Sequence, residues 1–201
     1  CASAARKAKK TLKRIFIVAM IPCRAWARFR EPGCSARICP STYGSSRSEK
    51  VRLSTHSLLL AEDSPEDAQL ILKALHPVIQ ESMVVLCTDG VEALDYLLAR
   101  NAHASRNSED LPGVALIDLN LPKINGLEVL RELREHPRTR LLPVIILSAS
   151  TERRDVRSAA LLGANSYVCK PHDYGRLRET VELLGRYWLD LNIPPPPTPP
   201  T

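Results

Sequence analysis

Residues 114–130, VALIDLNLPKINGLEVL, contain the pattern that decides the fold. The apolar run 114–117 predicts a strand buried on both faces, and Asp118 ends that run. Turn residues follow at 121–126, and apolar residues then return at helical spacing from Leu127. This stretch therefore predicts a strand, a loop and a helix, with a carboxylate at the carboxyl edge of the strand, where open α/β folds bind their ligands.

The same order of elements repeats on both sides of this stretch. Ser64 and Pro65 mark one clear helix start, because serine caps a helix and proline is favoured in its first turn. The apolar runs predict strands at residues 57–61, 83–87, 114–117, 142–147 and 165–169. Helical spacing predicts helices that begin near residues 64, 91, 127, 152 and 174, the last of them reaching about residue 188.

Five strands that alternate with five helices predict an α/β fold with a doubly wound, five-stranded parallel sheet of the flavodoxin-like type. The strands are continuous apolar runs, as a sheet covered by helices on both faces requires. Right-handed crossovers would then place the carboxyl ends of all five strands on one edge of the sheet.

Polar residues follow four of the strands at this edge. We expect them to converge, and they are Glu62, Asp63, Asp118, Ser148 and Lys170. Three crowded carboxylates repel one another and favour a bound cation, and hard oxygen ligands are those that Mg²⁺ prefers. The ammonium and the hydroxyl group would suit a tetrahedral oxyanion.

In this combination of residues the chain resembles the receiver domain of two-component response regulators, the CheY-like fold. The matching motifs are the acidic pair Glu62-Asp63, Asp118 in IDLNLP, Gly126 after the turn, Ser148 in LSAS and Lys170-Pro171 in YVCKP. The segments LLAEDSPEDA and LIDLNLPKINGLEVL are also similar in sequence to stand-alone receivers that work with phytochrome-type histidine kinases.

The resemblance implies a phosphoacceptor switch. Asp118 would accept a phosphoryl group from a phosphohistidine of a sensor histidine kinase. Glu62, Asp63, Asp118 and the backbone carbonyl of Asn120 would hold Mg²⁺. Lys170 would pair with the phosphoryl oxygens.

Further roles follow from the same resemblance. Ser148 would bind the phosphoryl group and move inward, and Tyr167 would follow it as the second switch residue. The Lys170–Pro171 peptide bond would be cis. Glu62 and Ser148 replace the more frequent Asp and Thr of the family but keep the required groups. The protein would be cytoplasmic and act as a switch rather than as an enzyme.

Charge and composition divide the chain into three parts. Residues 1–55 hold 13 basic and two acidic residues, against 15 and 20 in the rest of the chain. We expect residues 1–55 to be a disordered basic leader, residues 56–189 to be the receiver domain and residues 190–201 to be a Pro-rich tail. The alternative for the leader is an arm that binds a membrane surface or nucleic acid. Its longest apolar run, residues 15–21, is too short to span a bilayer.

Three residues are expected to be buried in the core, without a chemical role. Cys87 and Cys169 lie inside predicted strands and should be small buried hydrophobes, and Met83 should belong to the core.

Other functions remain as alternatives at this point. One is a phosphate-independent interaction module, although such a module needs none of the five polar residues. Another is a metal-dependent phosphatase, which would usually have a second aspartate at position 120, where this chain has Asn120. A truncated DNA-binding regulator is a variant of the switch, and a homodimer is a further expectation.

Overall fold

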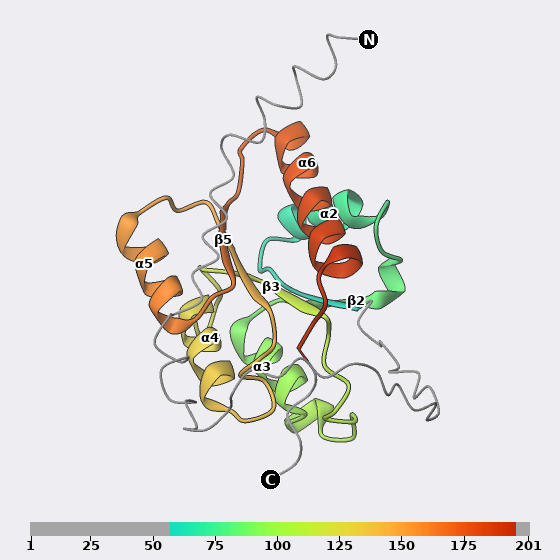
Figure 1. Ribbon diagram of the computed structural model, residues 1–201, viewed down its shortest axis with the longest axis vertical. Coiled ribbons are helices and arrows are strands. Elements are labelled where there is room, and N and C mark those ends of the chain that lie inside the picture. The colour runs from blue at the N-terminus through green and yellow to red at the C-terminus, as the bar shows by residue number, and fades with distance from the viewer. Residues whose placement is uncertain (1–56, 196–201) are drawn as a thin grey trace, which may run out of the picture.

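The computed structural model of the chain describes residues 57–195. Five parallel strands form one sheet in the order β2-β1-β3-β4-β5, and helices cover both of its faces (Figure 1). The prediction of a doubly wound α/β fold is therefore confirmed. The predicted disorder of residues 1–55 concerns residues outside this described range.

The strands are short and close to their predicted positions. They are β1 (Leu58–Ala61), β2 (Val84–Cys87), β3 (Val114–Asp118), β4 (Val144–Ser148) and β5 (Ser166–Cys169). The α-helices are α2 (Pro65–Leu75), α3 (Gly90–Leu98), α4 (Gly126–Glu135), α5 (Arg153–Leu162) and α6 (Tyr174–Gly185). Short helical turns are η3 (Glu81–Met83) and η4 (Asn101–His103), and a π-helix, η5 (Arg186–Leu191), continues α6.

Alternation along each strand divides the core into two halves. Leu58 and Leu60 of β1 belong to a cluster with residues of α2 and α6. Leu59 and Ala61 belong to a second cluster with residues of α3, α4 and α5. Because successive side chains of a strand point to opposite faces, each half of the core lies on one face of the sheet.

Side-chain caps fix where several helices begin. Ser64, Asp89 and Asp173 accept hydrogen bonds from the first turns of α2, α3 and α6. Asn125 and Glu128 form a reciprocal capping box at α4. Each cap satisfies backbone N–H groups that would otherwise lack partners. These helices therefore begin at defined residues just after the strand ends that carry the polar side chains.

The edge strands differ from the predicted burial. Met83 belongs to η3 rather than to a strand and its side chain is 40% exposed, and Cys169 at the end of β5 is also exposed. The expectation of burial is wrong for both, because Met83 lies in a helical turn before β2 and Cys169 ends β5, which has a neighbouring strand on one side only. Cys87 is buried as expected, and burial raises its pKa to about 12, so that its thiol is unreactive.

Arg134 of α4 connects three segments at the end of the sheet away from Asp118. Its guanidinium donates to the carbonyl oxygens of Leu142 and Gly163 and to Oδ1 of Asn165, each at 3.0 Å. Burial lowers the pKa of Arg134 to about 10, so the group remains charged at neutral pH. It serves as a multiple hydrogen-bond donor that holds the start of β4 and the turn before β5 against α4.

Replacing Arg134 tests this structural role. Arg134→Met leaves these acceptors without their donors, and we expect a loss of about 2–4 kcal/mol in the free energy of unfolding. Arg131→Met, an exposed position of the same helix, should change stability by less than about 0.5 kcal/mol. Urea denaturation measures both, and equal effects of the two substitutions would contradict the role given to Arg134.

Candidate functional site

Polar side chains meet at the carboxyl edge of the sheet, as the sequence predicts. Glu62 and Asp63 directly follow β1, and Asp118 ends the neighbouring strand β3. One carboxylate oxygen from each of these three residues lies within 4.8 Å of the other two. Glu62 and Asp118 are buried, whereas Asp63 is exposed and leaves the group open to solvent. The sheet topology alone therefore assembles an acidic cluster from two central strands.

Lys170 reaches this cluster from the end of β5. Its Nζ lies 2.6 Å from Oε2 of Glu62 and 3.5 Å from Oδ1 of Asp118. Burial lowers the pKa of the Lys170 ammonium, but the hydrogen bond to Glu62 and the charge of Asp118 outweigh burial and raise the pKa overall. Lys170 is therefore a permanently charged group inside the site.

For the two buried carboxylates, burial is the dominant influence on the pKa. Burial raises the pKa of both Glu62 and Asp118, and the opposing effect of Lys170 is smaller. One ammonium group does not neutralise three carboxylates, so excess negative charge collects at the open side of the cluster. Hard oxygen donors with solvent access and excess negative charge fit a divalent cation such as Mg²⁺.

Ser148 and Tyr167 are connected through Ser150. Ser148 is fully buried at the end of β4, and its Oγ accepts a hydrogen bond of 3.1 Å from the Ser150 N–H. The Tyr167 hydroxyl donates to the Ser150 carbonyl at 2.9 Å. Tyr167 thus lies next to the loop after β4 rather than in the acidic cluster, with its side chain half-buried.

The loop after β3 passes very close to Asp118. A Cβ atom at Gly126 would lie 2.2 Å from the Asp118 carbonyl oxygen, which no side chain could tolerate. The Gly126 N–H donates to the Leu119 carbonyl at 2.9 Å. Gly126 therefore lets the first turn of α4 pack directly against the backbone that carries the Asp118 carboxylate. Asn120, in the same loop, is exposed.

One prediction about the site is wrong in this structure. No peptide bond among residues 57–195 is cis, so the Lys170–Pro171 bond is trans rather than cis as expected. The trans form is the more stable one for an X–Pro bond by about 0.5–1 kcal/mol unless the surroundings favour the cis form.

One residue of the site, Asp67, is not among those predicted from the sequence. It lies on the first turn of α2, and its Oδ2 is 3.2 Å from Nζ of Lys170. A signal was available, because only three residues separate β1 from α2, so the first turn of this helix must lie beside the strand ends. The sequence pattern indicates a helix start at Ser64 and Pro65, but it does not indicate that the Asp67 side chain points into the site.

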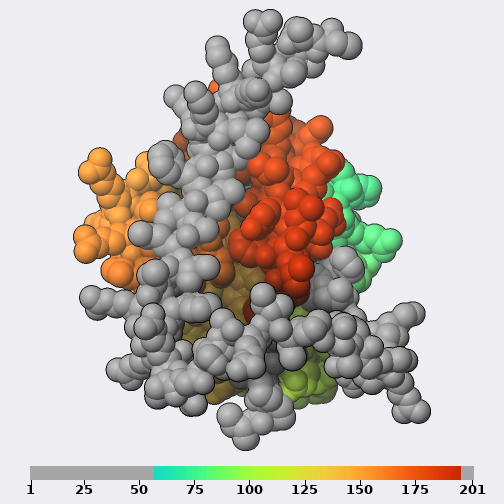
Figure 2. Space-filling model, in the orientation of Figure 1, coloured from blue at the N-terminus to red at the C-terminus, as the bar shows by residue number. Residues whose placement is uncertain are grey.

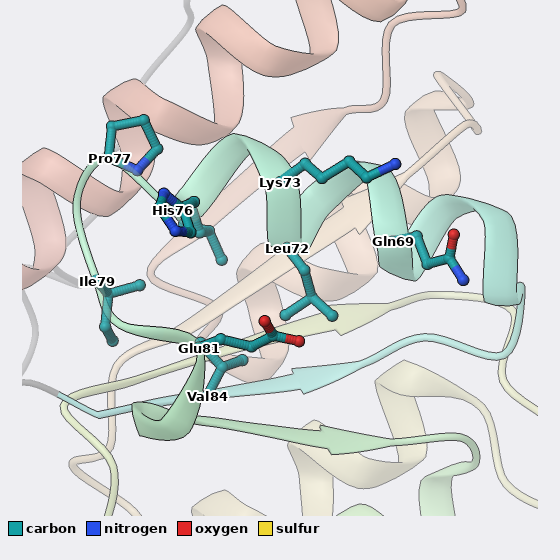
Figure 3. A pocket seen from close by; sticks show the side chains of 9 residues that line it. Gln69, Leu72, Lys73, His76, Pro77, Ile79, Glu81 and Val84 are labelled. Atoms are coloured by element: carbon teal, nitrogen blue, oxygen red, sulfur yellow. The ribbon is translucent and has the colours of Figure 1, made fainter.

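A hollow on the molecular surface lies away from the acidic cluster. A hollow of about 310 Å³ lies between the C-terminal half of α2 and the start of β2 (Figure 3). None of the predicted site residues lines this hollow. Within residues 57–195, no helix combines the length and the apolar character needed to cross a bilayer.

Comparison with known proteins agrees with this geometry. The chain is 37% identical over 140 residues to the probable methanogenesis regulatory protein FilR2 of Methanothrix harundinacea. The aligned region covers 70% of this chain and 88% of FilR2. It is 30% identical over 133 residues to response regulator Rcp1 of Synechocystis sp., covering 66% and 88% of the two chains.

Solved structures of similar proteins give the same result. The Mn²⁺-bound form of Rcp1 matches with a TM-score of 0.64 at 29% identity, covering 70% of this chain and 99% of that one. The phosphorylated cyanobacterial phytochrome response regulator RcpA matches with a TM-score of 0.64 at 32% identity, covering 71% and 99%. The sequence profile of the response regulator receiver domain matches residues 58–182. The chain thus belongs to the receiver domain family of two-component response regulators.

Proposed function

We propose that this response regulator accepts a phosphoryl group on Asp118 from a phosphohistidine of a sensor histidine kinase. A carboxylate oxygen of Asp118 would attack the phosphorus atom and the P–N bond would break as the P–O bond forms. The histidine side chain would leave as neutral imidazole, its ring nitrogen taking a proton from water. The observation that carries the proposal is the position of Asp118 in the three-carboxylate cluster, 3.5 Å from the Lys170 ammonium. A phosphate-independent module would have no use for charges that are costly to bury.

A divalent cation is part of this proposal. Glu62, Asp63, Asp118 and the backbone carbonyl of Asn120 would hold Mg²⁺, which would offset the repulsion between the carboxylate and the incoming phosphoryl group. The mutual proximity of three carboxylate oxygens supports the site. The Mn²⁺-bound form of Rcp1 supports divalent-cation binding by a similar protein.

Lys170 and Ser148 would act on the phosphoryl group itself. The Lys170 ammonium would pair with its oxygens as a fixed positive charge. The Ser148 hydroxyl can rotate to donate a hydrogen bond, since hydroxyl hydrogens turn to suit their partners. Ser148 ends β4, the strand next to β3, and this supports a role close to a phosphoryl group on Asp118.

Phosphorylation would then change the partner-binding surface around α5, β5 and α6. A movement of Ser148 toward the phosphoryl group would pull on the Ser150 N–H, and the Ser150 carbonyl holds the Tyr167 hydroxyl. The signal would therefore leave the site through Tyr167 of β5. The likeness to RcpA and to the bacteriophytochrome response regulator AtBRR supports a phytochrome-type kinase as the donor.

Labelling with acetyl phosphate tests the proposed acceptor. With Mg²⁺ present, intact-mass measurement should show a gain of one phosphoryl group in the wild-type chain. Removal of Mg²⁺ with EDTA should abolish the gain, and Asp118→Asn should show none because its amide is not a nucleophile. Absence of labelling in the folded wild-type protein under all conditions would refute the phosphoacceptor function.

A second copy of the chain is a further proposed partner. Leu183, Tyr187 and Leu191 follow one another at intervals of four residues along α6 and η5, and they are 46%, 43% and 73% exposed. Residues spaced in this way lie on one side of a helix. Figure 2 shows α6 (red) at the molecular surface. An exposed apolar stripe of this kind is typical of a protein contact.

Disruption of the stripe tests the homodimer. Leu191→Glu would place a charge in the apolar contact, and we expect the molar mass from light scattering to fall from that of a dimer to that of a monomer. Leu161→Glu, at an exposed leucine of α5, is the matched control and should remain dimeric. A wild-type chain that is monomeric at all concentrations would contradict the proposal.

A further inference from the structure

The Lys170 ammonium has a partner outside the acidic cluster. Asp67 accepts a hydrogen bond from Nζ of Lys170 at 3.2 Å, and Glu62 accepts one at 2.6 Å. Oδ1 of Asp118 lies farther from Nζ, at 3.5 Å, which is within the distance of an ion pair. The acceptor of the proposed reaction is thus the most distant of the three carboxylates around Lys170.

Asp67 differs from the proposed metal ligands in position. The carboxylates that come within 4.8 Å of one another are Glu62, Asp63 and Asp118, and Asp67 is not among them. Its side chain is 41% exposed, against 2% for Glu62 and 8% for Asp118. Asp67 therefore contacts the site through Lys170 and from the α2 side.

An ammonium group has three hydrogen atoms to donate, and Lys170 directs two of its bonds to Glu62 and Asp67. We propose that Asp67 is a positioning residue, which holds the Lys170 ammonium on the α2 side and competes with Asp118 for it. This inference rests on the proposed phosphoacceptor function. It adds that the charge of Asp67 limits how readily Asp118 accepts a phosphoryl group.

The competition should become stronger on phosphorylation. A phosphoryl group brings a charge of about −1.5 to −2 to the position of Asp118, which attracts the ammonium more strongly than a carboxylate does. Lys170 must then turn away from Asp67 to pair with it. Asp67→Asn keeps the shape of the side chain but removes its charge, so that Lys170 is released at lower cost.

The test compares initial rates of phosphorylation by acetyl phosphate at saturating Mg²⁺. We expect Asp67→Asn to be labelled about fivefold faster than wild type, which is the rate equivalent of one partly exposed ion pair. Glu66→Gln is the matched control, since it removes the same charge from an exposed neighbour on the same helical turn. Glu66 makes no ion pair with Lys170 within the described residues, so this control should change the rate less than about twofold.

A second measurement needs neither metal nor phosphoryl donor. Asp67→Asn, Lys170→Met and the double variant form a thermodynamic cycle, read by urea denaturation in EDTA. We expect the two positions to be coupled by about threefold or more in the folding equilibrium constant.

The labelling experiment can be repeated in the Lys170→Met background. In that background, Asp67→Asn should no longer accelerate labelling. A residue with a merely structural role would act equally in both backgrounds.

The outcomes separate this inference from the proposed function. Failure of wild-type labelling would remove the phosphoacceptor function and, with it, the role of Asp67. Wild-type labelling with an unchanged or lower rate in Asp67→Asn would overturn the inference about Asp67 alone. An equal acceleration by Glu66→Gln would overturn it as well, because the effect would then be one of overall charge.

Discussion

One buried ammonium group, that of Lys170, governs the arrangement of the site. A buried cation is costly unless carboxylates surround it, and here Glu62, Asp67 and Asp118 do so. These residues come from the ends of β1 and β3 and from the first turn of α2, while Lys170 follows β5. Since β4 separates β5 from β3, the Lys170 side chain extends past the end of β4 to reach Asp118. The strand order and the ion pairs therefore support each other.

The same ion pairs leave a charge imbalance that the proposed chemistry can use. Glu62, Asp63 and Asp118 provide more negative charge than one lysine neutralises, which favours a divalent cation at the open side. A phosphoryl group on Asp118 would add negative charge, attract the Lys170 ammonium and accept a hydrogen bond from the Ser148 hydroxyl. The Ser150 N–H donates to Ser148 and the Tyr167 hydroxyl donates to the Ser150 carbonyl, and these two hydrogen bonds would give that local change a physical route to the surface.

Most of the fold and the cluster itself could be predicted from the sequence, because both follow from local patterns. Buried apolar runs define parallel strands, and parallel strands place their carboxyl ends on one edge, so Glu62, Asp118 and Lys170 had to meet. Exposure of Met83 and Cys169 could not be predicted, since Met83 lies in a helical turn outside the sheet and Cys169 ends a strand at the edge of the sheet. The contact of Asp67 with Lys170 depends on side-chain direction, which a capping pattern does not contain.

If Asp118 carries the phosphoryl group, chemical mapping of the modified residue will locate it there. Borohydride reduces an acyl phosphate to the alcohol, so the reduced aspartate becomes a homoserine that tandem mass spectrometry can locate. We predict that homoserine appears at position 118 alone, in the peptide that contains residues 114–130, after phosphorylation with Mg²⁺. Homoserine at position 63 or 67, or at no position in a phosphorylated sample, would contradict the account.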